Sequence, residues 1–233
     1  MRLHIVRHAD PDYENDTITP AGHLEAAALA RRFATQGLDR LYASPLPRAA
    51  ITARYTSDLL KLPVETLEWA AEPRLRCDVT PWGRVAVWDI PGEVIRGGER
   101  MPSHDDCLDL EHLAGSGAGE HFAVFREHSD GFLAGLGYRR EGGRYRILRS
   151  HRERVAVFCH NGAALFWLAH LLEIPLTLAF SGFWHAPSSV TTVLLDERSE
   201  QWAVPRCLAV GDVSHLYEAR LPVQPRGIIT NYH

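Results

Sequence analysis

The sequence has very little lysine and no closely spaced cysteines. Lys61 is the only lysine, so the other basic residues are arginines, and the net charge is −4. This balance excludes the globally basic surface that nucleic-acid binding needs. The four cysteines are far apart and form no CxxC pair, which argues against a zinc ribbon. Widely spaced cysteines favour a reduced, cytoplasmic protein.

The sequence also lacks the segments and motifs that mark membrane insertion, export, metal binding and nucleotide binding. Its longest apolar run, residues 163–169, is far too short to span a bilayer, and the N-terminal MRLHIVRHAD has no signal-peptide stretch. No HExxH motif or HxH pair occurs among the 13 histidines, and there is no glycine-rich phosphate loop. We therefore expect no membrane association, no metal and no cofactor.

The apolar residues that are present predict an alternating α/β fold. Of the 233 residues, 45% are hydrophobic, which is enough for a substantial core. Strands are predicted at residues 3–6, 38–43, 64–67, 155–159, 190–195 and 203–210, and helices at 20–36, 44–60, 120–136 and 163–172. This alternation predicts a three-layer α/β/α sandwich with a mostly parallel central sheet, folded as a single domain over residues 1–233.

One stretch breaks the alternation. Residues 73–118 mix proline, glycine, tryptophan, aspartate and arginine without a clean period, and residues 115–119 read as a flexible turn. We interpret this stretch as an insertion over the carboxyl ends of the strands. The tail after Leu221 is rich in proline and is predicted to be irregular.

Charged and polar residues follow three of the predicted strands at their carboxyl ends, where open α/β sheets bind ligands. Arg7 and His8 follow the first strand, the segment 44–48 ending in Arg48 follows the second, and His160 follows the strand VAVFC. A histidine or arginine alone at such a place is usually structural or solvated. The convergence of two histidines and two arginines on one sheet edge favours a functional site.

These four side chains suit phosphoryl chemistry. Two guanidinium groups can hold the oxygens of a phosphoryl dianion bidentately. A neutral imidazole can attack phosphorus and form a covalent intermediate. Neighbouring cations keep the imidazole neutral and stabilise charge in the transition state.

Four segments, in this order and spacing, resemble the histidine phosphatase superfamily, also called the phosphoglycerate mutase-like superfamily. They are LHIVRHADPDY, ITPAGHLEAAALARRF, LYASPLPRAAITA and VAVFCHNGAALFWLAHLL. Each segment alone is a weak signal, whereas the combination is specific and extends over nearly the whole chain.

The resemblance implies a role for each matching residue. His8 becomes the nucleophile that carries the phosphoryl group, Arg7 and Arg48 bind that group, and His160 binds it from the other side and takes part in catalysis. The family places a general acid shortly after the third strand, and Glu72 fits this place best. Asp78, in the segment PRLRCD, is the rival.

The sequence departs from the family pattern at three places. Ala9 stands where the family has glycine after the nucleophile, and Asn161 separates His160 from the glycine that follows it. The family often has an asparagine about six residues after the nucleophile. Here Glu14 stands at that position with Asn15 beside it, which puts this contact in doubt.

Two further clusters allow both a functional and a structural interpretation. Seven arginines lie between Arg139 and Arg154, which suits a polyanion site, although a solvated strand edge is the preferred interpretation. Trp82, Trp88, Phe122 and Phe125, in or near the insertion, could line a substrate pocket or simply bury area.

These features predict a metal-independent phosphomonoester hydrolase that acts through a phosphohistidine on a small phosphorylated substrate. A phosphomutase is the first alternative, although the mutase segments of the family are absent. A non-catalytic protein that binds a phosphorylated ligand is the second. Neither the substrate nor the oligomeric state follows from the sequence.

Overall fold

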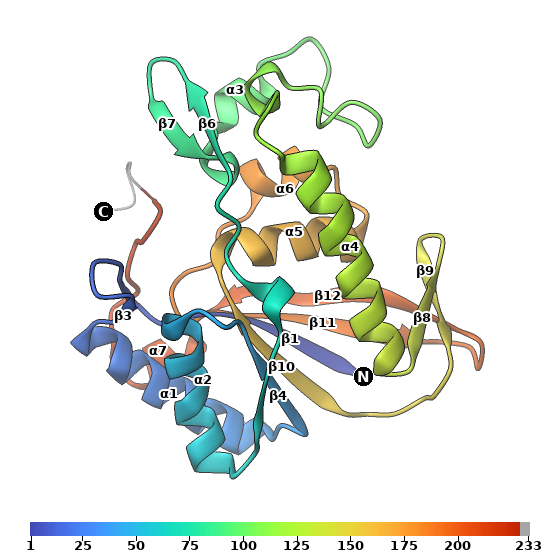
Figure 1. The fold of residues 1–233 in the computed structure, drawn as a ribbon. Coiled ribbons are helices and arrows are strands. Elements are labelled where there is room, and N and C mark those ends of the chain that lie inside the picture. The colour runs from blue at the N-terminus through green and yellow to red at the C-terminus, as the bar shows by residue number, and fades with distance from the viewer. Residues whose placement is uncertain (229–233) are drawn as a thin grey trace.

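A computed structural model describes residues 1–228 and shows an eight-stranded sheet between two layers of helices (Figure 1). The strand order is β5-β4-β10-β1-β11-β12-β9-β8. The strands are β1 (Arg2–Arg7), β4 (Arg40–Ala43), β5 (Val64–Thr66), β8 (Tyr138–Glu141), β9 (Arg144–Ile147), β10 (Arg154–Cys159), β11 (Val190–Glu197) and β12 (Trp202–Asp212). Residues 229–233, the end of the predicted irregular tail and of the predicted domain, lie outside the described residues.

The three-layer α/β/α arrangement is confirmed, but the sheet is mixed instead of mostly parallel. Strands β5, β4, β10 and β1 are parallel neighbours. From β1 through β11, β12 and β9 to β8, every pair is antiparallel. The difference follows from the connections, because β8–β9 and β11–β12 are joined by turns too short for the crossover that parallel strands require.

Helices cover both faces of the sheet. Helices α1 (Pro20–Gln36), α2 (Pro47–Leu60) and α7 (Ser214–Glu218) lie on one face. Helices α4 (Ala118–Gly135), α5 (Asn161–Leu172) and α6 (Leu176–Gly182) lie on the other. Helix α5 is buried from residue 161 to 171 because it is covered on one side by the sheet and on the other by α4 and α6. In the part of the chain described, no helix is both long and apolar enough to cross a membrane.

Local signals in the sequence fix the ends of α1. The Thr19 hydroxyl accepts a hydrogen bond from the Gly22 amide at 3.0 Å, and Pro20 occupies the first turn. Gly37 ends the helix with a φ of 78°, a conformation that favours glycine. The helix therefore runs over the predicted residues, and it begins directly after the loop that carries His8.

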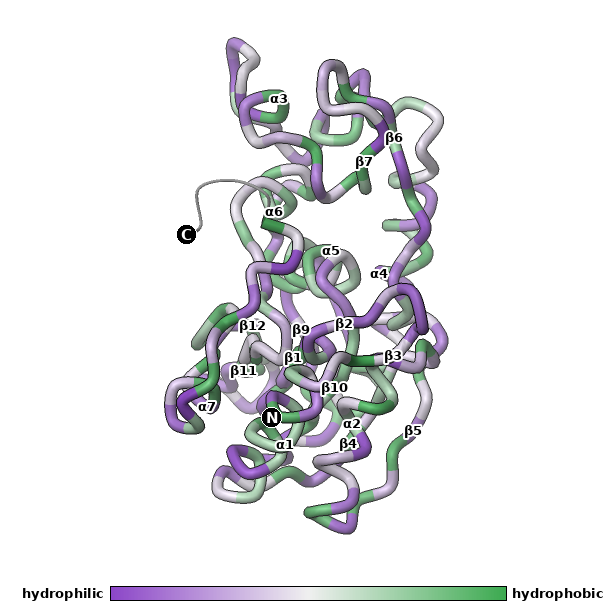
Figure 2. The backbone as a smooth tube through the Cα atoms, turned by 90° about the vertical axis from the view of Figure 1, so that its left-hand side faces the viewer, coloured by the Kyte–Doolittle hydropathy of each residue, from purple (hydrophilic) through white to green (hydrophobic). Residues whose placement is uncertain are grey.

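The segment interpreted as an insertion, residues 73–118, contains only short elements. These are β6 (Arg76–Val79), β7 (Gly83–Ala86), α3 (Gly92–Arg96) and the 3-10 turns η2 (Val87–Asp89) and η3 (Glu111–Leu113). Figures 1 and 2 show β6, β7 and α3 stacked beyond α5 and α6, on the side of the sheet away from α1 and α2. The remaining short elements are β2 (Pro11–Asp12), β3 (Thr17–Ile18) and η1 (Glu68–Ala70).

The arginine-rich segment comprises the β8–β9 hairpin at the sheet edge, the loop after it and the first residue of β10, and its charges are largely paired on the surface. Glu141 forms salt bridges with Arg139 at 3.1 Å and Arg146 at 2.8 Å. The guanidinium groups of Arg144 and Arg146 lie over the Trp202 ring. This arrangement agrees with a solvated strand edge, the preferred interpretation of the cluster.

Candidate active site

The parallel half of the sheet brings the predicted site residues to one edge. Arg7 is the last residue of β1, and His8 follows it; Arg48 lies in the first turn of α2; His160 follows β10 and caps α5. The His8 amide donates to the Cys159 carbonyl at 2.9 Å, which ties the two loops together. As a result, the His8 and His160 ring centroids are 5.1 Å apart.

His8 is buried and held with one ring nitrogen unprotonated. Its Nδ1 lies 2.8 Å from the Ala9 carbonyl oxygen, which can only accept, so Nδ1 must donate a proton there. Burial lowers the pKa of His8 well below its usual value, and the charges of Arg7 and Arg48 lower it further. The imidazole is therefore neutral near pH 7, with a free lone pair on Nε2 suited to nucleophilic attack.

His160 is oriented by Ser44, a residue that the sequence interpretation did not assign. The Ser44 Oγ lies 2.8 Å from His160 Nε2 and accepts a hydrogen bond from the Leu46 amide at 3.2 Å. Burial, and then the neighbouring charges, lower the pKa of His160 well below its usual value. Its Nδ1 is buried and has no hydrogen-bond partner within residues 1–228, so it can still contact a ligand.

Arg7 and Arg48 are each anchored at one nitrogen and unpaired at another. Arg7 Nη1 donates to the His185 carbonyl at 2.5 Å and to the Arg226 carbonyl at 3.1 Å. Arg48 Nη1 pairs with Asp16 at 3.0 Å. In both arginines Nε is buried without a partner among the described residues. Since buried donors rarely stay unpaired, these atoms indicate a place for an anion.

Glu72 lies next to the start of α5. The Ala163 amide donates to its Oε1 at 3.2 Å. Burial raises the pKa of Glu72 to about 7, although the charges of Arg7 and Arg48 and the amides of α5 oppose this rise. Near neutral pH the carboxyl group is therefore present in both protonation states, as a general acid and base requires.

Gly162 is required by this close packing. A Cβ at Gly162 would lie 2.6 Å from Glu72 Oε1 and 2.7 Å from the Trp88 ring. The glycine of the motif therefore stays essential here, even though Asn161 separates it from His160. The Asn161 side chain holds the segment after α6, because its Oδ1 accepts a hydrogen bond from the His185 amide at 3.2 Å.

The other acidic candidates lie elsewhere. Asp78 is exposed on β6, where its backbone pairs with Arg84 in the β6–β7 hairpin. Glu14 is exposed in the loop after β2, and Asn15 beside it bonds Asp12 at 2.9 Å. The structure thus brings Glu72, and neither of these two, to the start of α5.

Two supporting contacts connect distant parts of the chain and left no signal in the sequence. Asp10 is buried behind His8 and forms a salt bridge with Arg226 at 2.6 Å. The Arg226 carbonyl also accepts a hydrogen bond from Arg7, so the tail is linked to both Asp10 and Arg7. The partner of Arg48, Asp16, could have been predicted as a supporting residue, because it lies in the loop that follows His8.

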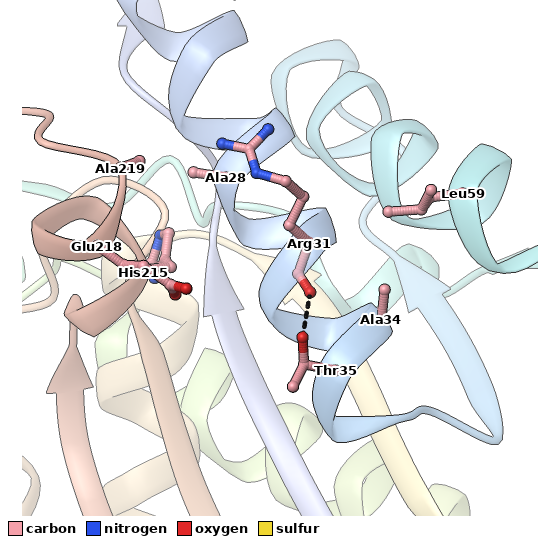
Figure 3. A pocket seen from close by; sticks show the side chains of 8 residues that line it. All are labelled: Ala28, Arg31, Ala34, Thr35, Leu59, His215, Glu218 and Ala219. Carbon is pink, nitrogen blue, oxygen red and sulfur yellow. Dashed lines mark hydrogen bonds between the residues drawn. The ribbon is translucent and has the colours of Figure 1, made fainter.

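A separate hollow of about 580 Å³ lies between α1, the end of α2 and α7 (Figure 3). Its wall includes Arg31, Leu59, His215 and Glu218, and the Thr35 hydroxyl donates to the Arg31 carbonyl at 3.2 Å. None of the predicted site residues lines this hollow, so it has no part in the chemistry at the sheet edge. Over residues 1–228, no three histidine, cysteine, aspartate or glutamate residues cluster as a metal site would require.

Comparisons with known proteins agree with this geometry. The sequence model of the histidine phosphatase superfamily (branch 1) matches residues 3–77. A Hydrogenobacter thermophilus protein, provisionally named phosphoserine phosphatase 2, is 38% identical over 68 residues. That match covers 25% of this chain, and the chain spans about a third (34%) of that relative's length.

Solved structures extend the likeness in fold over most of the chain. A mutant phosphoserine phosphatase of Entamoeba histolytica in complex with phosphoserine is 18% identical, with a TM-score of 0.62, covering 92% of this chain and 98% of that one. A mycobacterial glucosyl-3-phosphoglycerate phosphatase is 16% identical, with a TM-score of 0.56, covering 89% and 97%. At these identities the likeness concerns the fold. The chain thus matches the histidine phosphatase superfamily model over residues 3–77 and shares the fold of these phosphatases over most of its length.

Proposed function

We propose that this protein is a metal-independent phosphomonoester hydrolase that works through a phosphohistidine at His8. The observation that carries the proposal is the neutral, buried His8, whose Nε2 is left free by the Nδ1 contact to Ala9. Around it lie the unpaired buried nitrogens of Arg7, Arg48 and His160. A phosphoryl dianion would satisfy these donors, and such a group is the electrophile that a neutral imidazole attacks.

In the first half of the reaction, His8 Nε2 attacks phosphorus and the bond from phosphorus to the ester oxygen breaks. Glu72, in its protonated form, donates a proton to that departing oxygen, so the alcohol leaves neutral. Arg7, Arg48 and His160 hold the phosphoryl oxygens as charge builds up on them. The anchored Nη1 atoms fix both guanidinium groups before the substrate arrives.

In the second half, the ionised Glu72 takes a proton from water. The resulting hydroxide attacks phosphorus, the phosphorus–nitrogen bond breaks, and His8 and inorganic phosphate are released. Glu72 ends protonated, as it began, so protons and charge balance over the cycle. The raised pKa supports both halves, because one residue must serve as acid and then as base near neutral pH.

A hydrolysis panel tests the proposal. Purified protein is incubated with p-nitrophenyl phosphate and a range of alkyl and sugar phosphomonoesters without added metal, and released phosphate is measured. We expect hydrolysis that His8→Ala abolishes. Transfer of the phosphoryl group to a second alcohol without release of phosphate would indicate a phosphomutase, and binding without turnover a non-catalytic protein.

The cytoplasmic location expected from the sequence stays part of this proposal. All four cysteines are unpaired, as is usual in a reducing compartment. Fractionation of cells that express the chain with a tag would test it.

A further inference from the structure

A large cavity lies directly beside the proposed phosphoryl site. Its volume is about 790 Å³, and its wall is formed by the segment from Arg76 to Glu93, the end of α6 with the two residues that follow it, and residues 227 and 228 of the tail. Specific small-molecule pockets commonly have about 300–1,000 Å³. If the alcohol part of a phosphomonoester had only three carbons, water would fill most of this volume.

The wall of the cavity and the proposed general acid meet at one point. The ring of Trp88 and the carboxylate of Glu72 both lie within 2.8 Å of where a Cβ on Gly162 would stand. Asn161, the residue after His160, also lines the cavity. The ester oxygen that receives the Glu72 proton therefore leaves at the cavity wall, and the alcohol part of the substrate must occupy the cavity.

Aromatic rings form part of the apolar wall. Three indoles line the cavity: Trp82 on the β6–β7 turn, Trp88 in η2, and Trp184 after α6. Trp82 is 45% exposed, which leaves a large part of its ring uncovered by protein. Flat indole faces pack well against the C–H face of a ring and poorly against a short flexible chain.

The charged side chains that line the cavity balance one another. Arg76 and Arg84 face it together with Asp89 and Glu93, two cations against two carboxylates. Carboxylates accept strong hydrogen bonds from hydroxyl groups, and guanidinium groups donate to hydroxyl and ring oxygens. A balanced set of this kind suits an uncharged, polyhydroxylated alcohol better than an alcohol with a second anionic group.

We propose that the cavity selects phosphomonoesters of sugars in their ring form. This inference rests on the proposed function and specifies its substrate class. The indoles contact the ring face, Asp89 and Glu93 accept from the hydroxyl groups, and the phosphoryl group reaches His8. Small phosphorylated amino acids and glycerates would be poor substrates, because they fill little of the cavity and bring a carboxylate toward Asp89 and Glu93.

The test compares matched substrates at steady state. Glucose 6-phosphate contains a closed ring, whereas sorbitol 6-phosphate is the corresponding open chain. Phosphoserine is the small, charged comparison substrate. Hydrolysis of p-nitrophenyl phosphate reports on the catalytic groups alone. We expect kcat/KM for glucose 6-phosphate to exceed those for sorbitol 6-phosphate and phosphoserine, each by about tenfold or more.

Two exposed aromatic residues give a matched pair of variants. Trp82→Ala should raise KM for glucose 6-phosphate by about tenfold and leave KM for phosphoserine unchanged. Tyr217→Ala, on α7 at 72% exposure and outside the cavity lining, should change neither. Asp89→Asn should raise KM for glucose 6-phosphate more than KM for phosphoserine.

Equal efficiency on the ring and open-chain substrates would overturn the inference, as would an equal loss on every substrate in Trp82→Ala. Hydrolysis of p-nitrophenyl phosphate without hydrolysis of any sugar phosphate would also overturn it while leaving the proposed function intact. No hydrolysis of any ester, p-nitrophenyl phosphate included, would refute the proposed function itself.

Discussion

Replacing Glu72 by glutamine tests the acid–base assignment. Glutamine keeps the size of the side chain and can still accept from the Ala163 amide, but it has no transferable proton. An alkyl or sugar oxygen must be protonated as it leaves, whereas nitrophenolate leaves without help. Glu72→Gln should therefore slow phosphorylation of His8 by alkyl phosphates about 10²-fold or more, and by p-nitrophenyl phosphate much less.

The pH dependence of the two steps follows from the pKa of about 7. At pH 7 about half of the Glu72 side chains are protonated, against about 0.3% for a carboxyl group at the usual value of 4.5. Burial thus keeps a large share of the Glu72 side chains in the acid form near neutral pH. Phosphorylation by alkyl esters should fall as pH rises above about 7, because the acid form disappears, while breakdown of the phosphohistidine should rise toward that pH.

Rapid-quench kinetics measures the two steps separately, and Asp78→Asn is the matched control. If Asp78→Asn shows the loss that depends on the leaving group and Glu72→Gln does not, then Asp78 is the acid. If neither variant shows it, neither Glu72 nor Asp78 is the acid. Equal losses on alkyl and nitrophenyl esters in Glu72→Gln would refute proton donation to the leaving group.

The same variant has a stability readout. The pKa of Glu72 is higher in the folded state than in the unfolded state. The free energy of unfolding is therefore unaffected below about pH 4.5, falls as the pH rises to about 7, and stays lower above that pH. Glu72→Gln should therefore unfold at higher urea concentration than wild type at pH 8 and at a similar concentration at pH 4.

Three further predictions concern the phosphoryl site. Arg48→Ala should cost about 2–4 kcal/mol of transition-state stabilisation in kcat/KM, and Arg48→Lys should recover only part of it, because lysine keeps the charge but loses the planar fork; near-wild-type activity in both variants would place Arg48 outside the site. Hydrolysis should persist in excess EDTA, and a loss that a divalent ion restores would contradict the mechanism. Gly162→Ala should lower kcat for alkyl phosphates, because its methyl group would displace Glu72 or Trp88; an unchanged kcat would show that their packing is not required.

Local sequence signals predicted the parallel half of the sheet and the two arginines and two histidines at its edge. Thr19, Pro20 and Gly37 set the ends of α1 through capping and backbone preference, which depend on neighbours in the sequence. Arg7, His8 and His160 were found because parallel strands carry their carboxyl ends to one edge, so the order of elements places the residues.

The antiparallel half and the supporting contacts could not be predicted in the same way. The β8–β9 hairpin is rich in charged residues that pair within the hairpin, as Glu141 does with Arg146, or outside it, as Arg140 does with Glu173. Its hydrophobic pattern is therefore weak. The pairing of Asp10 with Arg226 joins residues 216 positions apart and depends on where the tail crosses the site. The cavity beside the proposed phosphoryl site likewise forms from four separate segments whose spacing has no period.

The central claim is tested most directly by trapping the intermediate. Wild-type protein and His8→Ala are mixed with a ³²P-labelled phosphomonoester, quenched in alkali within milliseconds, digested and analysed by mass spectrometry. The account predicts an acid-labile, alkali-stable phosphate on the peptide that contains His8, formed at up to one per chain and absent from His8→Ala. Label on another residue, or wild-type turnover without any phosphohistidine, would contradict it.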